Sequence, residues 1–224
     1  MLRRTLPCLC TASSHSLTPS SPQAIRHAVT VWNVDIITMS FGYEEESAGC
    51  DLIRRAIREA HAEGILMFAA ASNAGGHGNR PAFPARVSNI FSIYSGDGMG
   101  NCAPTNPNAV THEYNFLTLG EGVESWWPTA LARDPPHTKR LSGTSFATPI
   151  AAGIASFLLL YAAQNLPQGD ADMFREHDKM REWLYHMSHE RGGYNVISIA
   201  GFFNRSVDER RFILSNLLQG RSWK

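Results

Sequence analysis

The central part of the chain alternates short apolar runs with amphipathic stretches. Residues 34–41 (VDIITMSF) and 65–71 (ILMFAAA) are mostly apolar and are followed by turn-forming residues, which is typical of buried strands. Between them, apolar positions in residues 48–63 recur at helical spacing and a glycine follows, which predicts an amphipathic helix. Residues 87–94 and 116–119 predict two more strands. Strands that alternate with a helix in this way indicate a parallel α/β sheet.

The C-terminal part of the chain has mainly helical patterns. Residues 145–164 are apolar nearly all round, which predicts a central buried helix. Its apolar run, 149–163, is shorter than the roughly 20 residues that a membrane span needs, so we expect no membrane partner. Residues 171–188 are amphipathic and predict a surface helix, and residues 208–219 have a weaker helical pattern. The segment between the sheet and the central helix, 126–140, is expected to be a loop.

The first 24 residues have a different composition from the rest. Residues 11–22 are rich in Ser, Thr and Pro, which predicts a disordered lead or a mispredicted start at 1–24, followed by one domain at 25–224. The apolar stretch before them is too short for a signal peptide and is interrupted by Pro7. This favours an intracellular location, although the sequence leaves localisation open.

Composition and charge narrow the range of partners. The 20 basic side chains balance the 20 acidic ones, so the sequence has no overall positive charge for binding nucleic acid or an anionic membrane. The four cysteines lack zinc-site spacing, and free thiols are favoured over a single disulfide. No cluster of acidic or amide side chains has the spacing of calcium ligands, so neither a metal nor another cofactor is expected.

The strongest chemical signal is the segment GTSFATP at residues 143–149. It places Ser145 at the start of the buried helix, where unpaired backbone N–H groups and the helix dipole can hold a developing oxyanion. A serine that simply caps the helix is the alternative.

Two further segments lie at the carboxyl ends of predicted strands. Asn73, in AAASNAG (69–75), follows the second predicted strand, where its amide can donate a hydrogen bond to a ligand. The segment SFGY (40–43) follows the first strand and could pair with an extended peptide. Taken alone, each also fits an ordinary turn.

In their order along the chain, the segments SFGY, AAASNAG and GTSFATP resemble the subtilase family of serine endopeptidases. The resemblance extends over about residues 25–149. The resemblance implies a three-layer subtilisin-like fold around a parallel sheet and a polypeptide substrate. It also implies a nucleophile, an oxyanion donor and substrate-binding residues, which are Ser145, Asn73, and Ser40, Phe41 and Gly42, respectively.

The resemblance is incomplete, because subtilases place a catalytic Asp and then a catalytic His well before the SFGY position. Neither motif occurs among the residues before Ser40, and Asp35, His15, His27, His77 and His137 match no family position. We therefore expect a domain truncated at its N-terminal side, inactive alone, whose partner is a missing N-terminal half. A pseudoprotease that binds peptides and a non-functional fragment are the alternatives.

Overall fold

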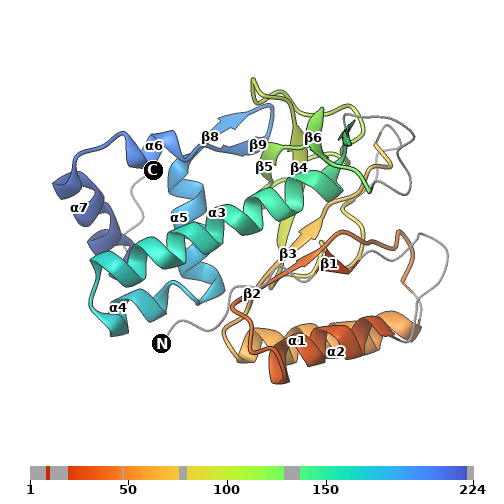
Figure 1. Cartoon of the computed structure of the whole chain (residues 1–224), viewed down its shortest axis with the longest axis horizontal. Coiled ribbons are helices and arrows are strands. Elements are labelled where there is room, and N and C mark those ends of the chain that lie inside the picture. The colour runs from red at the N-terminus through yellow and green to blue at the C-terminus, as the bar shows by residue number, and fades with distance from the viewer. Residues whose placement is uncertain (1–8, 11–19, 47, 76–79, 129–136, 221–224) are drawn as a thin grey trace.

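The computed structural model describes residues 9–10, 20–46, 48–75, 80–128 and 137–220 (Figure 1). Within these residues, a main sheet has the strand order β1-β2-β3-β4-β5-β9-β8, and all neighbouring strands are parallel except β8 and β9. Its strands are β1 (Leu9–Cys10), β2 (Ile36–Met39), β3 (Leu66–Ala70), β4 (Phe91–Gly96), β5 (Phe116–Leu119), β8 (Ser188–Arg191) and β9 (Tyr194–Ile197). The helices are α1 (Ser20–Thr30), α2 (Ala48–Ala62), α3 (Thr144–Asn165), α4 (Gln168–Met173), α5 (His177–Met187), α6 (Ala200–Phe203) and α7 (Val207–Leu218).

Alternate residues of the central strands face different helices. On one face, Ile37 and Met67 belong to a core cluster with residues of α1 and α2, which lie side by side (Figure 1). On the other face, Ile36, Leu66 and Phe68 belong to a cluster with α3 and the C-terminal helices. This alternation follows from the two-residue period of a strand. It confirms the predicted three-layer α/β fold around a mostly parallel sheet.

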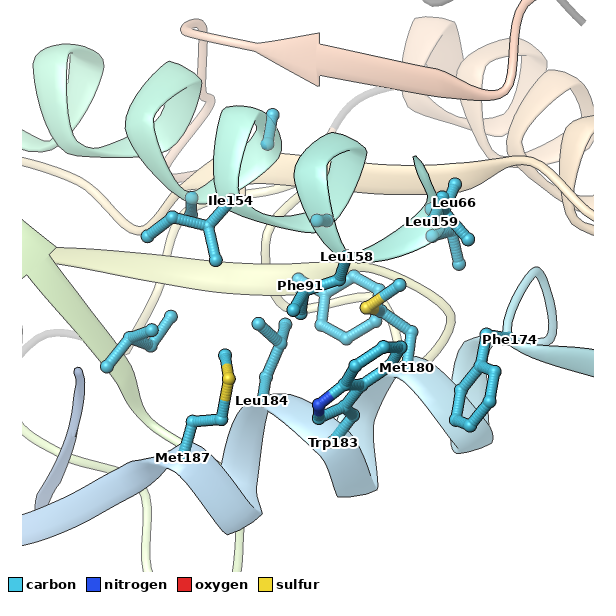
Figure 2. Packing of buried hydrophobic residues seen from close by; sticks show 14 of the residues in the cluster. Leu66, Phe91, Ile154, Leu158, Leu159, Phe174, Met180, Trp183, Leu184 and Met187 are labelled. Atoms are coloured by element: carbon cyan, nitrogen blue, oxygen red, sulfur yellow. The ribbon is translucent and has the colours of Figure 1, made fainter. Parts of the chain in front are cut away.

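Helix α3 is the centre of the larger core. Leu158 extends from α3 toward Phe91 of β4 and Met180 of α5, whereas Leu159 lies beside Leu66 of β3 (Figure 2). Among the described residues, α3 is the one helix long and apolar enough to cross a membrane, but half of its most apolar window is buried in the protein. Its packing on β2, β3, β4 and β5 is that of a core helix.

The strand predicted at 87–94 is observed as β4 (Phe91–Gly96), four residues later at its start, and two further predicted elements differ from those observed. The helix expected at 171–188 is two helices, α4 and α5, because the chain turns at Phe174, whose side chain is fully buried in the core. The segment expected to be a loop at 126–140 includes strand β7 (Thr138–Leu141), which pairs antiparallel with β6 (Val123–Trp126). The residues of this pair are partly or fully exposed, and Val123, Trp126 and Leu141 do not alternate regularly with polar residues, so no apolar pattern marks it.

The N-terminal segment contributes to the fold. Helix α1 begins at Ser20, ahead of the start at residue 25 that composition suggested. Leu9 and Cys10 form β1, which pairs with Thr38 and Met39 at the edge of the sheet. The rest of the predicted lead, residues 1–8 and 11–19, lies outside the described residues.

Candidate active site

Ser145 is the second residue of α3 and lies at the carboxyl ends of the parallel strands. The helix start is held there because the Gly143 N–H donates to the Gly120 carbonyl, at 2.8 Å. A side chain at Gly120 would place its Cβ 2.5 Å from the Ser95 Cβ and 3.0 Å from the Ala147 Cβ. Glycine at this position therefore lets α3 approach the ends of β4 and β5 closely.

In the first turn of α3, the Thr144 N–H donates to Asn73 Oδ1 at 2.9 Å, and the Phe146 and Ala147 N–H groups donate to the Gly143 carbonyl at 3.0 and 3.4 Å. The N-cap residue is Gly143, which has no side chain to accept a bond from the turn. The N–H of Ser145 lies in this turn, where helix geometry provides no acceptor. Such a group, at the positive end of a helix dipole, suits a ligand oxygen that carries negative charge.

Asn73 is bound to the start of the same helix. Its Oδ1 accepts from the Thr144 N–H at 2.9 Å and from the Thr144 hydroxyl at 3.1 Å. Because Oδ1 is held in this way, the orientation of the amide is fixed, and Nδ2 remains as a donor. The structure thus brings Asn73 to the residue next to Ser145, from segments that are 71 positions apart in the sequence.

The backbone around Asn73 is constrained. Ser72 has φ 140°, a conformation that costs a residue with a side chain roughly 1–3 kcal/mol. The Ser72 hydroxyl accepts from the Ala74 N–H at 3.1 Å, and the Gly75 N–H donates to the Thr105 carbonyl at 2.8 Å. These bonds hold the turn that presents Asn73.

Ser40 also reaches the helix start. It follows β2, and its hydroxyl donates to the Ser145 carbonyl at 3.1 Å. Ser40, Asn73 and Ser145, which come from three segments of the sequence, therefore gather at one edge of the sheet.

The other two residues of the predicted substrate-binding segment differ in exposure. Phe41 is 6% exposed and packs in the core cluster with α1 and α2. Gly42 is exposed, and a Cβ on it would lie 2.9 Å from the Ala82 Cβ, so glycine permits the close approach of these segments. Tyr43 exchanges backbone hydrogen bonds with Phe83, at 2.8 and 2.9 Å, which fixes the end of the segment.

The ionisable residues considered in the sequence lie elsewhere or make other contacts. Asp35 lies at the amino end of β2, opposite the carboxyl end where Ser40 follows, and forms an ion pair with Arg175. His27 lies on α1 with its ring centroid 5.0 Å from that of Trp32. The His137 carbonyl accepts from the Trp127 N–H at 2.8 Å, whereas His15 and His77 lie outside the described residues. Among the described residues, no imidazole or carboxylate is hydrogen-bonded to Ser145.

The structure also identifies site residues whose roles the sequence did not indicate, two of them inside the motif at 143–149 and one, Gly120, outside all three motifs. Thr144 orients Asn73, while Gly143 and Gly120 make room for the packing around them. The three-dimensional neighbours define these roles, so only an assignment of Asn73 and Ser145 to one site could have suggested them. Across the described ranges, no group of three or more His, Cys, Asp or Glu side chains could hold a metal ion.

Comparison with known proteins agrees with this geometry. A model of the subtilase family matches residues 10–202. The chain belongs to the subtilase family of serine peptidases. It is 35% identical over 145 residues to the subtilisin-like protease het-Q2 of Podospora anserina. The aligned region covers 63% of this chain and 38% of that protein. It is 31% identical over 128 residues to subtilisin DY of Bacillus licheniformis, and this aligned region covers 56% of this chain and 43% of that protein. In each case the match spans less than half of the relative.

Solved structures of similar fold extend over more of the chain. The prenylagaramide maturation protease PagA has a TM-score of 0.62 at 24% identity and covers 80% of this chain and 61% of its own. A point mutant of the protease domain of PatA has a TM-score of 0.64 at 22% identity and covers 91% and 66%, respectively. At this level of identity, the likeness supports the fold of this subtilase.

Proposed function

We propose that this chain supplies the nucleophile and the oxyanion-binding groups of a serine endopeptidase, and that a catalytic Asp and His come from residues outside these 224. The observation that carries the proposal is the pair of hydrogen bonds from Thr144 to Asn73 Oδ1, which orients the amide beside Ser145. A residue needed only to cap the helix would require no oriented amide next to it.

The chemistry that fits these groups is acyl transfer. The Ser145 hydroxyl would attack the carbonyl carbon of a peptide bond and lose its proton to the imidazole of the additional segment. Asn73 Nδ2 and the Ser145 N–H would donate to the resulting oxyanion. The imidazolium would return the proton to the departing amine, and water would then hydrolyse the acyl-enzyme.

The substrate in this proposal is an extended polypeptide. The exposed backbone at Gly42 offers room for a peptide to pair beside the segment that follows β2. The side chain of Phe41 packs in the core. Phe41 would therefore hold this segment in place and would not contact the peptide through its side chain.

Two surfaces support the need for an additional segment. Phe157 and Leu160 of α3 are 47% and 42% exposed, although most other apolar residues of this central helix are buried. At the sheet edge, β1 pairs with only Thr38 and Met39 of β2, so Ile36 and Ile37 have no partner on that side among the described residues. An uncovered apolar helix face and an unpaired strand edge are both sites at which further chain packs.

Labelling with a fluorophosphonate tests the proposal, because this probe forms a bond only with an activated serine. The full-length native protein is expected to be labelled at Ser145, and the Ser145→Ala variant is expected to remain unlabelled. Asn73→Ala should slow labelling by about 10²–10³-fold, since one oxyanion donor is lost. The 224-residue chain alone should not be labelled, because a serine without a base is a poor nucleophile.

Two results would contradict the proposal in different ways. A full-length protein that binds peptides but is not labelled would be a pseudoprotease. Labelling of the isolated chain at Ser145 would show that no further segment is needed.

A further inference from the structure

Pro149 leaves a gap in the hydrogen bonding of α3. It lies inside the helix, in the turn after Ser145. A helical N–H normally donates to the carbonyl four residues earlier, and proline has no N–H. The carbonyl deprived of its usual donor is therefore that of Ser145.

A side chain from another segment fills this gap. The Ser40 hydroxyl donates to the Ser145 carbonyl at 3.1 Å, across 105 positions of sequence. The nearby hydroxyl of Thr148 does not serve this carbonyl, since it donates to the Thr144 carbonyl at 2.7 Å. We propose that Ser40 is a positioning residue whose hydroxyl replaces the N–H missing at Pro149 and so holds the peptide unit of Ser145.

The consequence for the site is that the helix start is fixed from two directions. Asn73 binds the N–H of Thr144, on the N-terminal side of Ser145, and Ser40 binds the carbonyl of Ser145 itself. The segment proposed to bind substrate is thereby linked to the nucleophile by one hydrogen bond. This catalytic meaning rests on the proposed function, whereas the Ser40–Pro149 relation is a property of the fold.

A double-mutant cycle between Ser40 and Pro149 tests the inference, with urea unfolding of the full-length protein as the measurement. Ser40→Ala is expected to raise the unfolding equilibrium constant roughly tenfold, because it leaves a partly buried carbonyl without a donor. In the Pro149→Ala background, the alanine N–H can donate to the Ser145 carbonyl. The same Ser40→Ala change should then have about a twofold effect or less. Ser88→Ala, which removes an exposed serine hydroxyl, should have the same effect in both backgrounds.

Each outcome of the cycle bears on the inference. An equal effect of Ser40→Ala in both backgrounds would overturn it. If Ser40→Ala does not fold, recovery of folding in Ser40→Ala/Pro149→Ala would support it, and failure of both would overturn it.

A second readout connects the contact to catalysis. In the full-length protein, Ser40→Ala should slow fluorophosphonate labelling at Ser145, and Ser40→Thr, which keeps a hydroxyl, should restore the rate. If no variant is labelled, the proposed function fails while the unfolding cycle still decides the role of Ser40. If labelling is intact and the cycle shows no coupling, only the positioning role fails.

Discussion

Replacement of Gly143 by alanine is expected to destabilise the protein and to displace the Asn73 amide. Gly143 has φ 137° and ψ 167°, a backbone conformation essentially reserved for glycine. A Cβ at this position would lie 3.0 Å from Asn73 Nδ2 and 3.1 Å from Asn73 Oδ1. The methyl group and the oriented amide therefore compete for the same space.

The magnitude follows from two terms. An alanine forced into this conformation costs about 1–3 kcal/mol. If Asn73 moves away, the bond from the Thr144 N–H is weakened or lost, which costs about 0.5–1.5 kcal/mol. The free energy of unfolding should therefore fall by roughly 1.5–4.5 kcal/mol in total.

Gly122 provides a matched control. It also has a positive φ, 64°, but a Cβ built on it meets nothing within 4 Å. Gly122→Ala should cost only about 1–2 kcal/mol, from the backbone conformation alone. Urea unfolding of both variants measures the difference. Equal losses would refute the argument that the Gly143 site is reserved for packing against Asn73.

Three further predictions concern the frame around the site. Arg175→Met should cost about 3–5 kcal/mol in urea unfolding, because it removes a cationic partner of the fully buried Asp35 carboxylate; a loss below about 1 kcal/mol would contradict this. Burial lowers the pKa of His177, so the unfolded chain binds the extra proton more readily and stability should fall as the pH drops below about 6.5. His177→Gln should flatten that part of the pH profile, and an unchanged slope would assign it to other groups. Gly153→Ala should stabilise the protein by about 0.5–1 kcal/mol, since this helical position has open space around it; a loss of stability would indicate an unrecognised contact.

The sequence predicted the fold best where apolar patterns were strong. The strand at 116–119 was predicted with its observed bounds, and the helix at 48–63 differs from α2 by one residue at its C-terminal end. Both are buried against neighbouring layers, so the pattern of burial is written directly in their residues.

Weakly patterned elements were missed. The hairpin of β8 and β9 was not predicted, although Gly192 and Gly193 form its turn with φ 60° and 84°. A Gly-Gly pair between strand-forming residues is a hairpin signal, but β8 is polar and mostly exposed, so no apolar alternation accompanies the pair. The split between α4 and α5 depends on the burial of Phe174 among distant residues, which local periodicity does not record.

The candidate site was predicted in its members but not in its connections. The motifs point to Ser145, Asn73 and Ser40, and the structure brings the three together. The bonds from Thr144 to Asn73 and from Ser40 to the Ser145 carbonyl join segments 71 and 105 positions apart. Contacts of this kind depend on the packed sheet and could not be read from spacing. The roles assigned to these residues stay predictions until labelling is measured.

The central claim is that this chain carries one half of a catalytic site whose Asp and His lie in additional residues. The most direct measurement is the sequence of the native messenger RNA upstream of the Ile25 codon, together with the N-terminal sequence of the mature protein. The account predicts a continuous reading frame that encodes a strand ending in Asp and then a helix that begins with His. A mature protein that begins at Met1 would contradict it and would favour a pseudoprotease or a non-functional fragment.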